Sequence, residues 1–183
     1  MIEIRKAALT DAERLLEIYD YYVNNTAITF EYETPMIGEF SSRMEQTMKR
    51  YPYLVILQDG KIEGYAYAGP FVGRAAYDWS CEMTIYLDHE AQKQGLGRKL
   101  YEALEEALKS MGILNLYACI GYLETPDEYL TTNSADFHAH LGFAEIGHFH
   151  QCGYKFDRWY DMIWMEKIIG KHEDNQVPVT KYK

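Results

Sequence analysis

The residues best suited to chemistry lie between positions 92 and 98, where glycines and cations precede a long helical pattern. The stretch QKQGLGR follows an apolar segment typical of a strand and leads into leucines at helical spacing. A helix start offers unpaired backbone N–H groups and the positive end of the helix dipole, and glycines let the backbone approach phosphate oxygens. The stretch therefore indicates a loop that binds a pyrophosphate.

Two common phosphate-binding motifs do not fit this loop. A P-loop requires Gly-Lys followed by Ser or Thr, whereas Gly97 is followed by Arg98 and Lys99. A dinucleotide fingerprint places a third glycine or alanine where this chain has Leu100, and its strand opens a βαβ unit, whereas the strand here follows a hairpin. The remaining alternative is an ordinary helix start that carries glycine and surface lysine.

The elements that hold this loop follow from hydrophobic periodicity. Strands are predicted over residues 2–7, 53–58, 61–71, 76–87, 113–123, 143–154 and 158–168. Helices are predicted from a Thr10-x-x-Glu13 capping box to Val23, from Pro35 at a first helical position to Met48, from the glycine-rich loop to a stop at Gly112, and over 133–140. Residues 26–33 look extended, and Asp59-Gly60 indicates a hairpin turn. The order of elements predicts one α+β domain over residues 1–169, followed by a polar tail over 170–183.

Composition limits the possible partners. The net charge of -10 over 183 residues argues against nucleic-acid binding and against adhesion to anionic membranes. The three cysteines fit no zinc or CxxC spacing and indicate reduced thiols in a cytoplasmic protein. No apolar run is long enough to predict a membrane span.

The loop and its surroundings resemble the GCN5-related N-acetyltransferases, the GNAT superfamily. Gln92-x-x-Gly95-x-Gly97 after the strand EMTIYLD is similar to the superfamily signature Gln/Arg-x-x-Gly-x-Gly/Ala. The stretches that resemble its phosphinothricin N-acetyltransferase branch are IYDYYVNNTAITFE, RAAYDWSCEMTIYLDHEAQKQGLGRKLYEAL, FHAHLGF and GYKFDRWYDMIWMEK.

The resemblance implies transfer of acetyl from acetyl-CoA to a primary amine, with no metal and no covalent enzyme intermediate. It implies a mostly antiparallel, splayed sheet of about seven strands flanked by about four helices. The loop would hold the CoA pyrophosphate, and the preceding strand would pair with the pantetheine arm as an added strand does. The implied cofactor-binding residues are Ile85, Tyr86, Leu87, Lys93, Gln94, Gly95, Leu96, Gly97, Arg98 and Asn133.

The resemblance also assigns a base. A protonated amine cannot attack a thioester, and Glu82 matches the carboxylate that removes the proton in the family. Its apolar neighbours Cys81 and Met83 predict burial, which would raise the pKa of Glu82 toward the useful range. The alternative is a strand glutamate that faces solvent.

Histidine positions receive different interpretations. His138 stands four residues before Gly142, where many superfamily members carry a tyrosine that protonates the leaving thiolate and the branch carries histidine. It would donate that proton or help to accept the proton of the amine; the alternative is a histidine that packs on a short helix. His140 should point elsewhere. His148 and His150 share a strand face, but without a third ligand they do not predict a metal site.

The short helix departs from the family at one position. Ser134 fits the family serine, but Thr131 stands where the family has an asparagine, and the nearest asparagine is Asn133. Two roles stay open for Asn133, a contact with the pantetheine and the N-cap of the helix.

The acceptor pocket is assigned by analogy. The Arg74 guanidinium would donate two hydrogen bonds to the carboxylate of a small acidic substrate. The alternative is that Arg74 is a surface turn residue. Phe30 and Glu31 would close the pocket. The implied substrate-binding residues are Val72, Gly73, Arg74, Met83, Thr84 and Phe30. In relatives the C-terminal hairpin contributes to a two-fold dimer, so a homodimer is expected, with Trp159, Trp164 and Met165 in the core.

The leading hypothesis is an N-acetyltransferase for small amino-acid-like amines of the phosphinothricin or methionine sulfoximine type. A second hypothesis is acetylation of a protein N-terminus or a polyamine at an open acidic groove. A third is a CoA-binding module without turnover, which would need neither Glu82 nor His138.

Overall fold

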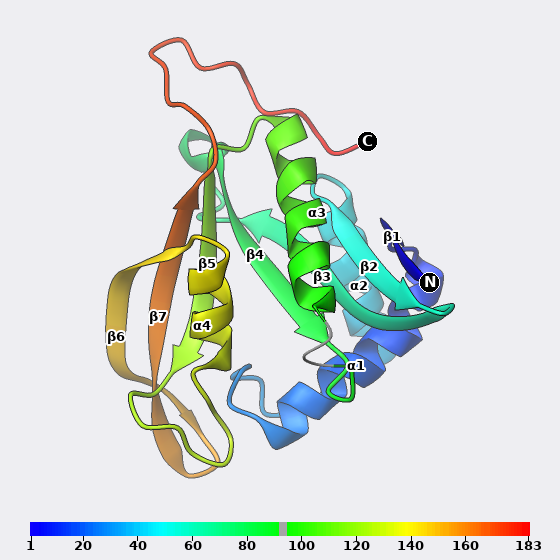
Figure 1. Ribbon diagram of the computed structural model, residues 1–183, viewed down its shortest axis with the longest axis vertical. Helices are drawn as coiled ribbons and strands as arrows, with labels where there is room; N and C mark the ends of the chain where they lie inside the picture. Colours follow the sequence, from blue (N-terminus) through cyan, green and yellow to red (C-terminus); the bar gives the residue numbers. More distant parts are fainter. Residues whose placement is uncertain (92–94) are drawn as a thin grey trace. The chain divides into compact units, whose positions relative to one another are not determined.

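A computed structural model describes residues 1–91 and 95–183 of the chain (Figure 1). The strands are β1 (Ile2–Lys6), β2 (Tyr53–Gln58), β3 (Lys61–Pro70), β4 (Ser80–Leu87), β5 (Asn115–Tyr122), β6 (Ala144–Lys155) and β7 (Arg158–Ile168). The helices are α1 (Ala12–Asn25), α2 (Ile37–Met48), α3 (Leu96–Met111) and α4 (Asn133–His140), with short 3-10 turns η1 (Leu9–Asp11) and η2 (Ala75–Tyr77). A seven-stranded sheet in the order β1-β2-β3-β4-β5-β7-β6 confirms the predicted α+β fold.

The chain divides into two compact units. The first contains residues 1–18, 35–116 and 168–183, and therefore β1 to β4, α2 and α3. The second contains residues 19–34 and 117–167, and therefore α4, β6, β7 and most of β5.

In the first unit, the antiparallel strands β1 to β4 carry helices on both faces. The predicted Asp59-Gly60 turn joins β2 to β3, with φ angles of 52° and 85° that a two-residue hairpin of this kind requires. Register places Tyr53, Tyr67 and Thr84 on one face, where the neighbouring Tyr65 ring meets the Phe40 ring of α2 edge-on.

Helix α3 lies over β2, β3 and β4 in the same unit (Figure 1). Leu96, Leu100, Leu104 and Leu108 are buried, as their helical spacing predicts. Gly95 and Gly112 bound the helix with φ angles of 74° and 94°, a left-handed conformation that glycine adopts at low cost. Gly112 thus confirms the predicted stop.

In the second unit, β6 and β7 form an antiparallel hairpin with two register shifts, between Glu145 and Gly147 and between Phe149 and Gly153. Ala27, Leu130 and Tyr160 form a buried cluster against which Phe30 packs. An added Cβ at Gly153 would lie 2.4 Å from the Phe30 ring, so this glycine makes room for the aromatic side chain.

Several local predictions are wrong at helix starts. Asp11, not Thr10, caps the first helical turn, because its carboxylate accepts the Ala8 N–H at 2.8 Å. Pro35 precedes the N-cap Met36 instead of opening α2. Thr132, not Asn133, is the N-cap of α4.

Other predictions fail in strands and in the core. The segment predicted as a strand from residue 76 begins with η2, and β4 starts at Ser80. Residues 26–33, expected to be extended, include bends at residues 27–29 and 32–33. Trp159 is 56% exposed and does not belong to the core, Trp164 is half-buried, and Met165 is buried as expected.

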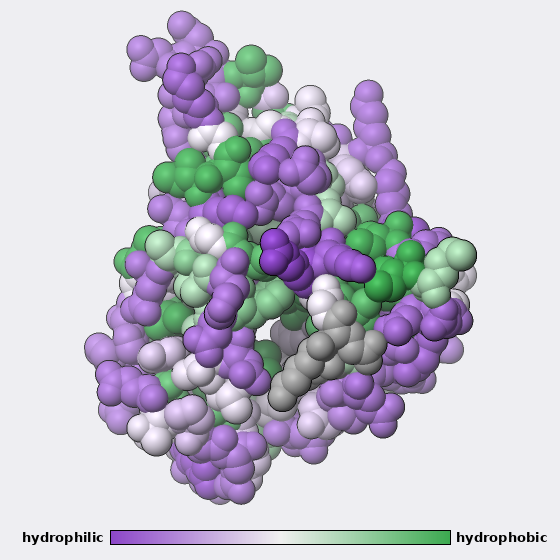
Figure 2. Space-filling view, viewed as in Figure 1, coloured by the Kyte–Doolittle hydropathy of each residue, from purple (hydrophilic) through white to green (hydrophobic). Residues whose placement is uncertain are grey.

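The segment from residue 170 onward has no helix or strand, and its visible atoms are mostly hydrophilic (Figure 2). It nevertheless makes specific contacts within the first unit. The Trp79 indole N–H donates to the Val177 carbonyl at 2.8 Å, and the Thr180 and Tyr182 N–H groups donate to the carbonyls of Met111 and Arg50. These bonds fix the course of the polar tail.

Candidate active site

Glu82 lies on β4, where the register pairs it with Gly69 of β3. Side-chain alternation puts Glu82 on the face of Thr84 and Tyr86, whereas Cys81 and Met83 are buried on the opposite face. Burial raises the pKa of Glu82, the direction that suits a base working near neutral pH. The side chains of the apolar sequence neighbours therefore point away from the face that carries the Glu82 side chain.

That face is largely aromatic. The Tyr53 and Tyr67 rings stack with centroids 4.8 Å apart, and Tyr65 lies 5.6 Å from Tyr86. Gly69 interrupts the aromatic surface opposite Glu82, and an added Cβ there would meet no atom within 4 Å. The glycine thus leaves open space beside the carboxyl group.

A cavity of about 530 Å³ lies between the end of α2 and the segment that follows β3. Gly69, Gly73 and Arg74 line it, so two of the predicted acceptor residues share one cavity with the cross-strand partner of Glu82. Arg50 also lines it, and the Arg50 guanidinium lies 3.0 Å from the Asp78 carboxylate. Val72 is exposed nearby in sequence, and Thr84 is half-buried on β4.

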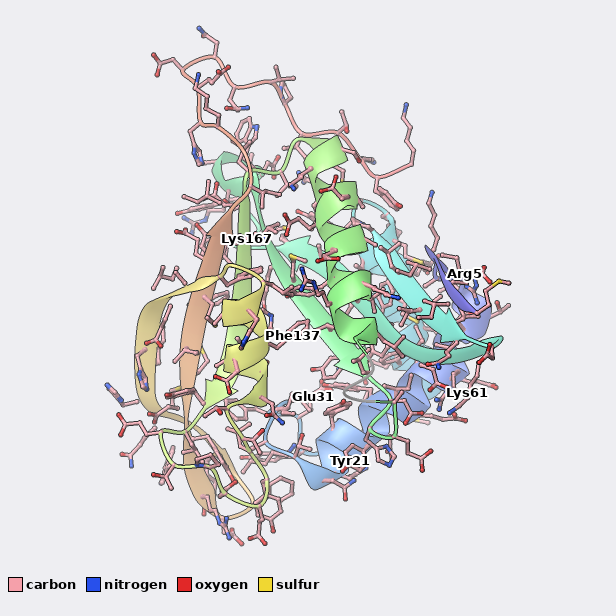
Figure 3. All side chains as sticks on the ribbon, viewed as in Figure 1. Arg5, Tyr21, Glu31, Lys61, Phe137 and Lys167 are labelled. Atoms are coloured by element: carbon pink, nitrogen blue, oxygen red, sulfur yellow. The ribbon has the colours of Figure 1, made fainter. Side chains whose placement is uncertain are left out.

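The glycine-rich loop is anchored at its start by Asp88. This buried carboxylate accepts the Glu90 N–H at 2.9 Å and pairs with Arg14, and the ammonium of Lys61, labelled in Figure 3, lies 3.6 Å away. Burial opposes ionisation, but the Glu90 N–H and the Arg14 guanidinium keep the pKa of Asp88 below its usual value. Lys61 also lowers the pKa of Asp88. The ionised Asp88 carboxylate is therefore held in place just after the end of β4.

Beyond this anchor, the loop enters α3. Lys93 and Gln94 lie outside the described residues. Leu96 is the first residue of α3 after the left-handed Gly95, and Gly97 is buried in its first turn. Arg98 is 70% exposed and its Nε donates to Glu102 at 2.7 Å. Ile85, Tyr86 and Leu87, the residues predicted to pair with the pantetheine, are half-buried at the end of β4.

His138 is buried in α4, in the second unit. Its Nδ1 lies 2.7 Å from the Ser134 carbonyl oxygen. Because a carbonyl only accepts, Nδ1 carries the proton in the neutral ring and Nε2 is the basic nitrogen. Burial lowers the pKa of His138, and the bond to Ser134 opposes this only in part. The Phe137 ring, labelled in Figure 3, and the Phe143 ring each lie 5.3 Å from the imidazole at right angles.

Asn133 is exposed at the start of α4, and its N–H donates to the Thr131 hydroxyl at 3.3 Å. Its contact with a cofactor remains a prediction. His140 is exposed, and its Nδ1 lies 2.6 Å from the Asp136 carbonyl oxygen.

The segment that carries Phe30 and Glu31 is held by a lysine that sequence reasoning missed. The buried ammonium of Lys155 donates to the carbonyls of Val23, Thr26 and Thr29 at 2.7, 2.8 and 2.8 Å. The Tyr19 hydroxyl of α1 donates at 2.8 Å to the carboxylate of Glu31, which is labelled in Figure 3. The only signal in the sequence was a lysine in an otherwise strand-like pattern.

Comparison with known proteins gives the family of the chain. The family described as Acetyltransferase (GNAT) domain matches residues 4–164. The chain is 34% identical over 166 residues to a phosphinothricin N-acetyltransferase of Streptomyces viridochromogenes, a match that covers 91% of this chain and 87% of that protein.

Two solved structures are also similar. A GNAT superfamily phosphinothricin acetyltransferase from Sinorhizobium meliloti in complex with AcCoA has a TM-score of 0.87 at 31% identity, covering 100% of this chain and 98% of that one. A ribosomal-protein-alanine N-acetyltransferase from Brucella melitensis has a TM-score of 0.84 at 30% identity, covering 91% and 99%.

The chain therefore belongs to the GNAT acetyltransferase family. It is an N-acetyltransferase that uses acetyl-CoA as its cosubstrate, on the fold that the sequence predicts. Within the described ranges, no helix is long and apolar enough to cross a membrane.

Proposed function

We propose that this protein transfers acetyl from acetyl-CoA to the primary amine of a small amino-acid-like acceptor of the phosphinothricin or methionine sulfoximine type. The observation that carries the proposal is Glu82, a half-buried carboxyl group of raised pKa on the strand that leads into the glycine-rich loop. The relatives at 30–34% identity that are named phosphinothricin N-acetyltransferases support the acceptor class.

Glu82 acts as the general base. The amine nitrogen forms a bond to the thioester carbon and its proton passes to the Glu82 carboxylate. The carbon–sulfur bond then breaks, and the CoA thiolate leaves and takes up a proton. A well-placed base of this kind contributes on the order of 10²–10⁴-fold to the rate. The loop of Gly95, Gly97 and Arg98, with the predicted contacts of Lys93 and Gln94, holds the pyrophosphate.

His138 is a second catalytic residue in this proposal. Its lowered pKa keeps the ring neutral at physiological pH, and the basic Nε2 then accepts a proton more readily than it donates one. This supports the role of helping Glu82 to accept the protons of the amine over a role in protonating the thiolate.

Arg74 supplies the preference for a carboxylate in the acceptor. It lines the cavity of about 530 Å³ together with Arg50 and Asp78, and the Arg50 guanidinium pairs with the Asp78 carboxylate. The Arg74 guanidinium beside this open volume favours a small acidic ligand, because a guanidinium donates to both oxygens of a carboxylate.

The experiment measures free-thiol release from acetyl-CoA across a panel of amines. The panel pairs each amino acid with the same amine lacking the carboxylate, and includes phosphinothricin, methionine sulfoximine, spermidine and a peptide with N-terminal alanine. We expect the two amino-acid analogues to be the best acceptors, and the Arg74→Gln variant to lose its preference for the carboxylate. Equal turnover of each matched pair would contradict the acceptor class.

A second candidate function is acetylation of a protein N-terminus, which the similarity to the ribosomal-protein-alanine N-acetyltransferase favours. The acidic residues that would attract a basic partner are already paired, since Asp127 and Glu128 bind Arg158, and Glu102 binds Arg98. Faster turnover of the alanine peptide than of any amino acid would establish this alternative. A binding module would turn over no amine in the panel.

We further propose that the protein acts in the cytoplasm as a homodimer. The exposed thiols of Cys119 and Cys152 suit a reducing compartment, and the exposed Phe149, Tyr154 and Trp159 of the C-terminal hairpin suit an interface. Light scattering of the purified protein measures its mass directly, and a monomer at micromolar concentration would contradict the dimer.

A further inference from the structure

Two histidines and one aspartate meet on the β6–β7 hairpin of the second unit. His148 and His150 lie on β6 and Asp161 lies on β7. One ligand atom from each of the three lies within 4.8 Å of the other two. No other group of three or more such side chains comes this close within residues 1–91 and 95–183. Asp161 is the third ligand that the His-x-His pattern lacked in the sequence.

The pairing of β6 with β7 brings the three side chains together. Phe149 pairs with Met162, so His150 follows opposite Asp161, and His148 lies two residues away on the same face. Gly153 next pairs with Tyr160, so residues 150–152 of β6 stand opposite the single residue Asp161 of β7. Gln151 takes up the extra length of this bulge with a φ of 46°, an uncommon value for a residue with a side chain.

The carboxylate is oriented by the bulge itself. The Gln151 N–H donates to Oδ1 of Asp161 at 2.7 Å, which directs Oδ2 toward the histidines. Oδ2 lies 2.8 Å from His148 Nε2 and 3.5 Å from His150 Nδ1. On the far side of the first ring, Glu145 Oε1 lies 3.9 Å from His148 Nδ1. Hydrogen-bonded carboxylates and a second carboxylate behind a histidine are the features that orient ligands around protein-bound metals.

The burial of the cluster also suits a metal with an open coordination position. The side chains of His148 and Asp161 are 22% and 17% exposed, whereas that of His150 is 76% exposed. Two ligands are thus held in place, and the third can rotate onto an ion arriving from solvent. The two imidazole rings already lie with centroids 4.2 Å apart.

We propose that His148, His150 and Asp161 bind one divalent transition-metal ion of the Zn²⁺ type, which joins β6 to β7 across the bulge. Zn–N and Zn–O bonds of about 2.0–2.2 Å place tetrahedral ligand atoms about 3.4 Å apart, so the cluster reaches this geometry by shifts on the order of 1 Å. Two imidazoles and one carboxylate suit Zn²⁺, Co²⁺, Ni²⁺ and Cu²⁺ better than Mg²⁺ or Ca²⁺. Three protein ligands leave one position for water.

This site is separate from acetyl transfer. None of the three ligands belongs to the residues proposed to bind acetyl-CoA or the acceptor, and the metal supplies no step of that reaction. Its expected effect is on the hairpin, because a ligand that binds only the folded state stabilises that state.

The test is isothermal titration of Zn²⁺ into the full-length protein without a histidine tag, in the absence of acetyl-CoA, followed by thermal unfolding with and without the metal. We expect one equivalent to bind and the unfolding temperature to rise. Co²⁺ added in place of Zn²⁺ should give the intense visible absorption of a four-coordinate ion.

The variants separate this site from incidental binding. His150→Gln changes an exposed side chain and Asp161→Asn keeps an oxygen for the Gln151 N–H, so both should fold; each should weaken Zn²⁺ binding at least tenfold and abolish the thermal shift. His140→Gln and Cys152→Ser, which change a histidine and a thiol outside the cluster, should bind as the wild type does. Failure of the wild type to bind one equivalent, or unchanged affinity in His150→Gln and Asp161→Asn, would mean that the cluster is an ion pair only and would overturn the proposal.

Discussion

Replacement of Lys155 by methionine should destabilise the second unit. The ammonium group of Lys155 donates three hydrogen bonds to backbone carbonyls. One of these is the carbonyl of Val23 in the last turn of α1, where carbonyls accept no hydrogen bond from within the helix. Lys155 therefore caps α1 and fixes the segment from Thr26 to Thr29, although it lies more than a hundred residues away. Methionine has a similar volume and no donor, so Lys155→Met removes the bonds and keeps the packing.

The magnitude follows from two opposing terms. Hydrogen bonds from a charged donor contribute roughly 1.5–3 kcal/mol each, or roughly 5–9 kcal/mol for three. Burial lowers the pKa of Lys155 from 10.5 to about 8, which corresponds to roughly 3 kcal/mol against the charged form. The difference predicts that Lys155→Met lowers the free energy of unfolding by roughly 2–6 kcal/mol.

The pH dependence has a defined sign. Because the folded pKa of Lys155 is about 8 and the unfolded value is 10.5, unfolding takes up a proton between these values. The wild type should therefore gain stability relative to Lys155→Met as the pH rises through this window.

Urea unfolding at several pH values measures both effects, and hydrogen exchange of residues 26–31 reports on the segment itself. Lys171→Met is the matched control, because Lys171 is 84% exposed and contacts only Glu173 among the described contacts of its side chain. If Lys155→Met lost no more stability than Lys171→Met, the capping role would be refuted.

Three further predictions concern single positions. Gly95→Ala should lower the free energy of unfolding by about 1–2 kcal/mol, because Gly95 has a φ of 74° that alanine adopts with strain. The same variant should bind CoA more weakly in calorimetry. Gly153→Ala should lower the free energy of unfolding by roughly 1–3 kcal/mol, because the added Cβ would lie 2.4 Å from the Phe30 ring. Gly38→Ala is the control, because an added Cβ there meets no atom within 4 Å and should not destabilise the protein. Denaturant unfolding measures both variants. Burial raises the pKa of Cys81, so Ellman's reagent should react with the two exposed thiols of the native protein, and with Cys81 only after unfolding.

Features that depend on short stretches of sequence were predictable. The Asp59-Gly60 turn and the Gly112 stop follow from backbone conformations that few residues adopt, and both occur where expected. The buried stripe of α3 follows from the period of the helix. The glycine-rich loop pointed to the family because its residue types and spacing match the superfamily signature.

Features that depend on contacts between distant segments were not predictable. The bends over residues 26–33 are held by Lys155, which no local pattern connects to them. Asp161 meets the histidines only through the pairing of β6 with β7, a contact between two strands. The burial of Glu82 was expected from Cys81 and Met83, but the pleat of the sheet turns those side chains to the other face. In each case tertiary packing, not sequence order, decides which side chains meet.

The most direct test of the central claim is the pH dependence of kcat for the wild type and the Glu82→Gln variant with a saturating amine. In the proposed mechanism the Glu82 carboxylate is the active form, so wild-type kcat should fall as the pH drops through the raised pKa of Glu82. In the Glu82→Gln variant, kcat should be about 10²–10⁴-fold lower and should no longer show this decrease at low pH. The affinity of the variant for CoA should equal that of the wild type. A variant with wild-type turnover and the same acid limb would contradict the account, because the proton of the amine would then pass to another group.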